Sequence, residues 1–192
     1  DSFALVDALL QQLPGIVKAG SPRVVLEVGC GSGYVICSAA IALRQAAAAA
    51  DRTPGSSFLA VDISAPALAA TARTLAAHEV SGVDLVRSDL LGPLSTRLQG
   101  CIDLLLFNPP YVPTPDEEVE RDGIARAWAG GYRGRRVIDR VLPLLPDLLA
   151  PGGHFFMVTV LENEPEGAVV LQRGADEECL KILHLRKDAG AG

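Results

Sequence analysis

Short apolar, β-branched runs alternate along the chain with longer stretches in which apolar residues recur at helical spacing. The first stretch predicts an opening amphipathic helix, because its apolar residues return every three or four positions: Phe3, Val6, Leu9, Leu10 and Leu13. The compact runs predict five strands, at 23–28, 58–62, 83–87, 102–107 and 154–160.

The segments between these strands predict the other elements. Helices are expected over 33–50, from a cap at Ser64 with Pro66 in its first turn, and over 135–149 with bends at Pro143 and Pro146. The runs 168–172 and 179–186 predict a closing antiparallel pair. Strands that alternate with helices form right-handed βαβ units, so we expect residues 1–192 to form a single three-layer α/β domain.

Composition excludes several classes of protein. The chain has 192 residues, of which 49% are hydrophobic and 21% charged, which argues against a disordered chain or a disulfide scaffold. No uninterrupted apolar run approaches the ~20 residues of a membrane span. A net charge of −6 without a basic tract argues against nucleic-acid binding. No C-x-x-C pair occurs, so we expect no metal site, and buried reduced thiols, at the four cysteines: Cys30, Cys37, Cys101 and Cys179.

A glycine-rich turn, E-V-G-C-G-S-G over 27–33, follows the first predicted strand. Gly29, Gly31 and Gly33 allow a tight turn and close approach of a ligand to the backbone. Their spacing differs from G-x-G-x-x-G, and the acid Glu27 precedes them. A carboxylate here would oppose a pyrophosphate but would suit a ligand with an ammonium or sulfonium charge.

Two further acids stand where the next strands end. Asp62, followed by Ile63, can accept hydrogen bonds from both hydroxyls of a ribose. In Ser88-Asp89-Leu90, the carboxylate can accept from an adenine amino group while Leu90 covers the ring. Together with Glu27, these positions predict a site for S-adenosylmethionine, which is released as S-adenosylhomocysteine after methyl transfer.

The tetrad Asn108-Pro109-Pro110-Tyr111 follows the fourth predicted strand. Its prolines stiffen the turn and remove two backbone donors, which leaves the Asn108 side-chain oxygen and the Pro109 carbonyl as acceptors. Tyr111 adds an aromatic wall. Such a clamp can hold a planar –NH2 group and direct its nitrogen at a methyl sulfonium, so these four residues are the predicted catalytic site.

These motifs together resemble the HemK family of class I S-adenosylmethionine-dependent methyltransferases. The similarity extends from residue 1 to about 164, and the W-A-G-G run at Trp128 and the P-G-G run at Pro151 bring it closest to the eukaryotic and archaeal branch. The resemblance implies a Rossmann-like fold with a mostly parallel seven-stranded sheet and an antiparallel closing strand. It adds Phe3 to the cofactor pocket, Ser2 beside it, and Trp128 to a lid over the substrate, although a single Trp is more often a core residue.

The resemblance also implies the substrate and partners. The family methylates the glutamine side-chain amide of the Gly-Gly-Gln motif in class 1 translation termination factors. Eukaryotic members act as heterodimers with a small zinc-binding activator, which the resemblance places along the edge strand 83–87. A mammalian relative is reported to methylate a histone H4 lysine, which keeps a second substrate open. We therefore expect a cytoplasmic enzyme, with the nucleus as a further compartment, and no membrane partner.

Two departures from the family pattern stand out. Only Asp1 remains of an acidic segment that precedes the opening helix in the family, so we expect the native chain to extend upstream. Only about eight residues, 161–168, separate the fifth and sixth predicted strands, where the family has a helix. Either this form is shortened, or a helix near 164–168 is missing from the sequence around Gly167.

Other readings remain open. The acidic run Asp116–Asp122 is either a solvated loop or a surface that attracts a basic peptide, and the arginines at 133–136 serve the following helix or the lid. The three histidines, at positions 78, 154 and 184, are expected to be isolated. The alternative functions are an adenine-N6 DNA methyltransferase, a nicotinamide oxidoreductase and a scaffold that binds the cofactor without catalysis.

Overall fold

The computed structural model describes residues 1–51, 55–119, 128–164, 168–175 and 178–189, and its centre is a seven-stranded sheet. The strands are β1 (Val24–Val28), β2 (Ser57–Asp62), β3 (Val83–Arg87), β4 (Ile102–Phe107), β5 (Leu149–Val160), β6 (Ala168–Ala175) and β7 (Glu178–Arg186). Their order is β3-β2-β1-β4-β5-β7-β6. Strands β1 to β5 pair in parallel and β7 is antiparallel to β5, which confirms the predicted fold class.

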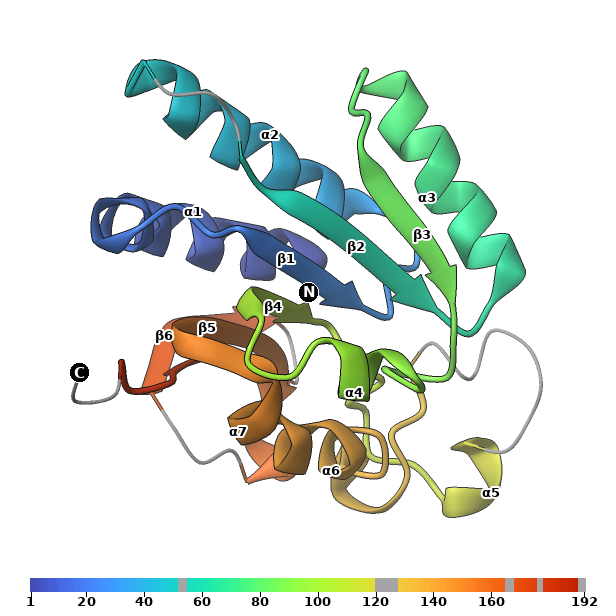
Figure 1. The fold of residues 1–192 in the computed structure, drawn as a ribbon. Helices are drawn as coiled ribbons and strands as arrows, with labels where there is room; N and C mark the ends of the chain where they lie inside the picture. The colour runs from blue at the N-terminus through green and yellow to red at the C-terminus, as the bar shows by residue number, and fades with distance from the viewer. Residues whose placement is uncertain (52–54, 120–127, 165–167, 176–177, 190–192) are drawn as a thin grey trace.

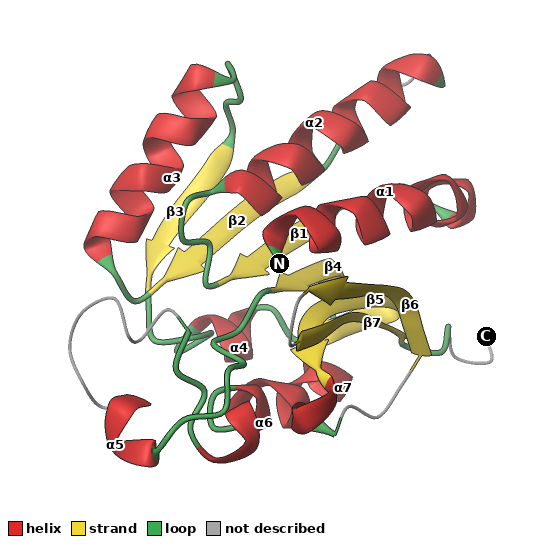
Figure 2. Cartoon of the chain, turned by 180° about the vertical axis from the view of Figure 1, so that it is seen from behind, coloured by secondary structure: helices red, strands yellow, loops and turns green. Residues whose placement is uncertain are grey.

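Helices cover both faces of the sheet. Figure 1 shows α1 (Ser2–Ala19), α2 (Tyr34–Ala49) and α3 (Ala65–Ala77) gathered on one side of the strands. The short helices α4 (Leu94–Arg97), α6 (Ile138–Val141) and α7 (Leu145–Leu148) lie on the other side. Seen from behind in Figure 2, β5, β7 and β6 form the end of the sheet remote from β3.

The first helix buries one stripe of its apolar residues. Val6, Leu9 and Leu13 lie in the core, as their spacing predicted, whereas Leu10 and Phe3 are exposed. Phe3 instead packs edge-on against Tyr34 of α2, with ring centroids 4.8 Å apart. None of the helices in the described residues combines the length and apolar content that crossing a bilayer would require.

The prediction of one helix over 135–149 is wrong, because the structure has several short helical segments there. The chain forms a 3₁₀ turn, η2 (Tyr132–Gly134), then α6, a second 3₁₀ turn η3 (Leu142–Leu144), and α7. Pro143 is the second residue of η3 and Pro146 the second residue of α7, and each removes a hydrogen-bond donor and so prevents one continuous helix. Strand β5 also begins at Leu149, before the expected 154, and a register shift against β4 accommodates the glycines after Pro151.

Two expectations about side chains are also corrected. His154 and His184 are not isolated: their rings stack across β5 and β7, with Nδ1 of the first 2.8 Å from Nε2 of the second. Cys30 and Cys37 are buried as expected, but Cys101 is exposed. Burial raises the pKa of the Cys30 thiol to about 12, which keeps it protonated.

Candidate functional site

The predicted site residues lie at the carboxyl ends of β1 to β4, where the order of the sheet reverses. The chain runs outward from β1 to β2 and β3 and then returns to β4 on the other side of β1. Ligands of open α/β sheets bind outside such a switch point. The turn after β1 and the tetrad after β4 are adjacent here, because a Cβ on Gly29 would lie 4.0 Å from the Asn108 carbonyl oxygen.

The glycine turn adopts a backbone that its glycines permit. Gly29, Gly31 and Gly33 all have positive φ, and a Cβ on Gly33 would approach the Thr71 backbone of α3 to 2.8 Å. Thr71 secures the turn by donating its hydroxyl to the Gly31 carbonyl over 3.1 Å. The turn is therefore preformed, with its backbone open to a close ligand.

Glu27 is buried beneath this turn, with 2% of its surface exposed. Its carboxylate accepts a hydrogen bond from the Ile36 amide in the first turn of α2, at 2.9 Å. Burial raises the pKa of Glu27 well above its usual value, and the nearby Asp62 raises it further, while the Ile36 amide lowers it. Since this helix end already faces a carboxylate, it is poorly suited to a pyrophosphate and better suited to a cationic group.

Asp62 lies at the end of β2 and faces the same turn. Its Oδ2 accepts from the Gly31 amide at 3.0 Å and its Oδ1 from the Ser64 amide at 2.8 Å. The bond that orients the Gly31 amide therefore comes from Asp62. Each carboxylate oxygen has a second lone pair, so the residue can still accept from ribose hydroxyls. Ile63 beside it is exposed.

The third acid lies farther out. Asp89 follows β3 and forms an ion pair of 2.7 Å with Arg140 of α6. Leu90 has a positive φ of 48°, a strained backbone for a non-glycine residue, and it packs partly against the core. This ion pair links the predicted adenine-binding residue to α6, which lies on the side of the sheet away from α1, α2 and α3.

The tetrad itself is largely buried. Pro109 and Tyr111 are buried, while Asn108 and Pro110 are half-buried. The Asn108 Nδ2 donates to the Ser2 hydroxyl at 3.1 Å, and this bond fixes the orientation of the amide. Its Oδ1 is buried and has no hydrogen-bond partner among the described residues. An orphaned buried acceptor costs about 1–3 kcal/mol, so this oxygen is placed to receive an N–H donor from outside the chain.

The predicted lid packs directly against the tetrad. Trp128 is 42% exposed and therefore not a core residue, and its carbonyl accepts from the Val112 amide at 3.1 Å. A Cβ on Gly130 would lie 2.7 Å from the Pro110 carbonyl oxygen, so only glycine fits that position without a shift. The W-A-G-G run thus lies beside the Asn108-Pro109-Pro110-Tyr111 tetrad.

Charged residues form ion pairs and hydrogen bonds next to this predicted lid segment, at residues 133–136. Arg133 pairs with Glu164, Arg135 pairs with Asp139, and Arg136 donates to the Asp116 carbonyl. All of these residues except Glu164 line an open pocket of about 510 Å³, together with Tyr132. Arg135 pairs with the start of α6, whereas Arg133 and Arg136 contact other segments, so both expected roles of these arginines, in the following helix and in the lid, stay predictions. In the acidic run, Asp116 caps the Tyr132 amide, whereas Glu120 and Asp122 lie outside the described residues.

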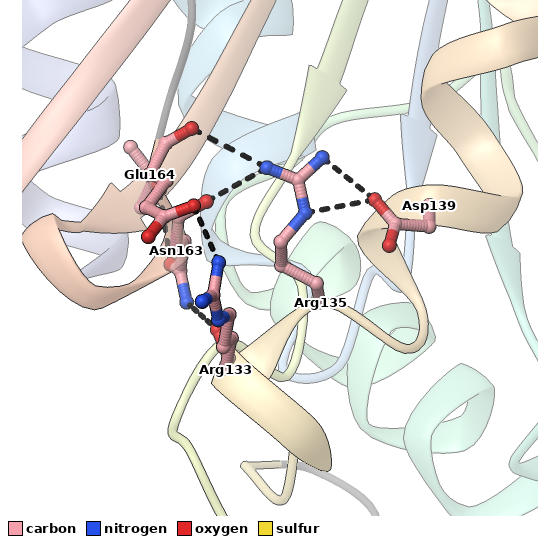
Figure 3. A network of polar contacts seen from close by, with 6 residues as sticks. Arg133, Arg135, Asp139, Asn163 and Glu164 are labelled. Atoms are coloured by element: carbon pink, nitrogen blue, oxygen red, sulfur yellow. Dashed lines mark hydrogen bonds and ion pairs between the residues drawn. The ribbon is translucent and has the colours of Figure 1, made fainter.

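Sequence reasoning missed Asn163, which lies 2% exposed after β5. Figure 3 shows it in the network with Arg133, Arg135 and Glu164. It also missed Arg140 as a partner of Asp89. Both contacts join residues far apart in the chain, so no short-range sequence pattern predicts them.

Comparisons with known proteins agree with this geometry. Residues 6–127 match the family model of the methyltransferase small domain. The chain is 41% identical to mouse "Methyltransferase HEMK2", over 97% of this chain and 87% of the relative. It is 34% identical to "eRF1 methyltransferase catalytic subunit mtq2" of Schizosaccharomyces pombe, over 96% of this chain and 86% of the relative.

Solved structures agree on the fold. TrmN from Thermus thermophilus superposes with a TM-score of 0.59 at 22% identity, over 93% of this chain and 48% of that one. The family and the fold confirm the predicted methyltransferase that uses S-adenosylmethionine. This chain therefore belongs to the methyltransferase small-domain family, in its HemK branch.

Proposed function

We propose that this chain transfers the methyl group of S-adenosylmethionine to the side-chain amide nitrogen of the glutamine in the Gly-Gly-Gln motif of a class 1 translation termination factor. The observation that carries the proposal is the buried, partnerless Oδ1 of Asn108 beside the acceptor-rich Pro109 turn. The name of the fission-yeast relative, an eRF1 methyltransferase subunit, supports the same substrate class.

The residues present fit the cofactor. Glu27 and Asp62 supply negative charge and acceptors beside the glycine turn, with Asp89 and Leu90 for the adenine and Phe3 at the entrance. When bound, the cofactor supplies a methyl group on a cationic sulfur, which is activated for attack by a nucleophile.

Catalysis in this proposal is mainly positioning. An amide nitrogen is a poor nucleophile because its lone pair is delocalised into the carbonyl. Asn108 Oδ1 and the Pro109 carbonyl would hold the two amide hydrogens and stabilise the positive charge that nitrogen acquires. The nitrogen lone pair would take the methyl group, the cofactor's sulfur would keep the electrons of the C–S bond, and the surplus proton would pass to water. Tyr111 and Trp128 would flank the substrate.

A labelling experiment tests the proposal. The purified protein, with and without activator, is incubated with methyl-labelled S-adenosylmethionine and a Gly-Gly-Gln peptide, and the modified atom is mapped by mass spectrometry. A matched peptide with glutamate in place of glutamine is the control, and a histone H4 peptide and a DNA duplex cover the alternatives. Label on the glutamine amide alone is expected. Label on lysine or adenine and never on glutamine would overturn the proposed substrate.

An Asn108→Ala variant tests the carrying observation. Losing a preorganised acceptor of this kind costs roughly 100-fold in kcat. We expect that loss toward the glutamine peptide, measured at saturating cofactor. Full activity in the variant would restore the reading of a scaffold that binds the cofactor without catalysis.

We also propose a heterodimer in which a small zinc-binding activator adds to β3 by strand pairing. This strand is one edge of the sheet, and Asp84 and Arg87 on it are exposed while its other residues are half-buried. With a termination factor as substrate the enzyme would act in the cytoplasm, and a histone substrate would place it in the nucleus as well.

A further inference from the structure

Asn163 lies where three segments of the chain meet. It ends η4 (Leu161–Asn163), directly after β5, and it is 2% exposed. The tetrad and the lid contact it from the side away from β5, through the backbone carbonyls of Tyr111 and Arg133. A polar side chain so deeply buried must be matched by hydrogen bonds, because an unmatched one destabilises the fold.

All four hydrogen-bonding positions of the Asn163 side chain are used. Its Oδ1 accepts from the Thr159 hydroxyl and the Val160 amide, both at 2.9 Å, which anchors it to β5. Its Nδ2 donates to the Tyr111 carbonyl at 2.9 Å and to the Arg133 carbonyl at 2.7 Å. An asparagine has two donors and two acceptor lone pairs, so it is saturated here.

The surrounding backbone leaves no space for another arrangement. Gly134 has a φ of +67°, and a Cβ there would overlap the Tyr111 carbonyl oxygen. The same Cβ would stand 2.5 Å from the Asn163 Nδ2. The tetrad and the lid therefore touch backbone to backbone, and Asn163 bonds to both at their contact.

We propose that Asn163 is a positioning residue that locks Tyr111 and the lid segment 130–134 into one geometry for methyl transfer. This inference rests on the proposed function, in which Tyr111 flanks the target amide. Asn163 does not touch substrate or cofactor; it acts through the two carbonyls that it holds. Its loss frees the tetrad and the lid to move separately, which lowers the fraction of bound substrate that is aligned.

An Asn163→Ala variant tests the inference, with Thr159→Val as matched control. The control removes one bond to Oδ1 and leaves both Nδ2 bonds intact. We expect Asn163→Ala to lower kcat at least tenfold with cofactor affinity changed less than twofold, and the control to keep kcat within about twofold. Equal kcat losses in both variants, or no loss in either, would overturn the positioning role.

A second readout needs no turnover. Trp128 is the single tryptophan, and its carbonyl bonds to the residue that follows Tyr111. Its fluorescence should be quenched more readily by acrylamide in Asn163→Ala than in the wild type or the control. An unchanged quenching constant would count against the inference even if the wild type proved inactive on glutamine, so this outcome and a failure of the proposed function are distinguishable.

If the Asn163→Ala variant does not fold, a measurement on the wild-type protein still tests the inference. The side-chain amide protons of Asn163 in ¹⁵N-labelled protein should exchange slowly with solvent, and more slowly still when the Gly-Gly-Gln peptide is bound. Rapid exchange, or exchange unaffected by peptide, would overturn the inference.

Discussion

At the scale of single residues, the site contains buried polar groups whose burial costs free energy and which lie where a ligand could bind. Glu27 is the clearest example, because it occupies the core beside a second carboxylate, Asp62, and receives one backbone hydrogen bond. Asn108 likewise keeps a buried oxygen without a partner. Such features destabilise the free protein, and a bound ligand that supplies the missing charge or donor relieves them.

The first prediction concerns Glu27→Gln. Because folding raises the pKa of Glu27, its contribution to stability is full below the unfolded pKa, about 4.5, and is lost as pH rises through the folded pKa. The glutamine keeps an acceptor for the Ile36 amide and removes that loss, so the free variant should melt higher than the wild type at neutral pH. It should bind S-adenosylmethionine at least tenfold more weakly, measured by calorimetry, because a hydrogen bond between charged groups is lost.

The pH dependence of cofactor binding provides the control for this prediction. Binding by the wild type should tighten as pH rises through the folded pKa of Glu27, since only the ionised carboxylate attracts a cationic group. That part of the pH dependence should be missing in Glu27→Gln. Equal affinity in both proteins would show that the carboxylate serves helix α2 and not the ligand.

At the scale of elements, the sequence predicts best what depends on local pattern. Strands β1 to β4 are short runs rich in apolar residues, and the glycine turn and the tetrad follow two of them. That the turn and the tetrad meet at one edge of the sheet therefore follows from parallel pairing. The prediction of one helix over 135–149 is wrong because the apolar residues there have helical spacing, whereas Pro143 and Pro146 prevent a continuous helix. The hydrogen bonds of Asn163 could not be predicted from the sequence. They depend on contact between the backbones at Tyr111 and Arg133, which no short-range sequence pattern encodes.

The second prediction belongs to the pairing of β5 with β7. Burial lowers the pKa of His154 to about 4, helped by the positive charges of His184 and Arg186, and burial also lowers the pKa of His184. A histidine with a lowered folded pKa contributes stability that is full above about 6.5 and is lost as pH falls toward 4. The free energy of unfolding should therefore fall between pH 6.5 and 5, by at most roughly 1.4 kcal/mol per pH unit for each histidine.

A His154→Gln variant separates this contribution from that of the carboxylates. The glutamine can still hydrogen-bond to His184 but does not titrate, so its urea midpoint should fall less between pH 7 and pH 5 than that of the wild type. An identical fall in both proteins would assign the pH dependence to groups outside the pair.

At the scale of the whole molecule, the sheet has two edges of different character. One is β6, which pairs with β7, and the other is β3, which pairs with β2 on one side only. An edge strand with half-buried apolar residues presents unpaired backbone groups and invites pairing with another chain. The hydrophobic content of 49%, high for a chain of 192 residues, is consistent with such an interface at β3.

The third prediction is that the activator protects this edge from hydrogen exchange. In the chain alone, those amides of Val83–Arg87 that point away from β2 should exchange quickly, because they lack a partner strand. In the complex the same amides should exchange at least tenfold more slowly, while the amides of β6 keep their rates and serve as the internal control. Protection that appears at β6 or at the lid, with β3 unchanged, would move the interface away from the edge strand. Protection at β3 would place the partner away from the tetrad, since β3 lies two strands from β1 and three from β4 in the order of the sheet.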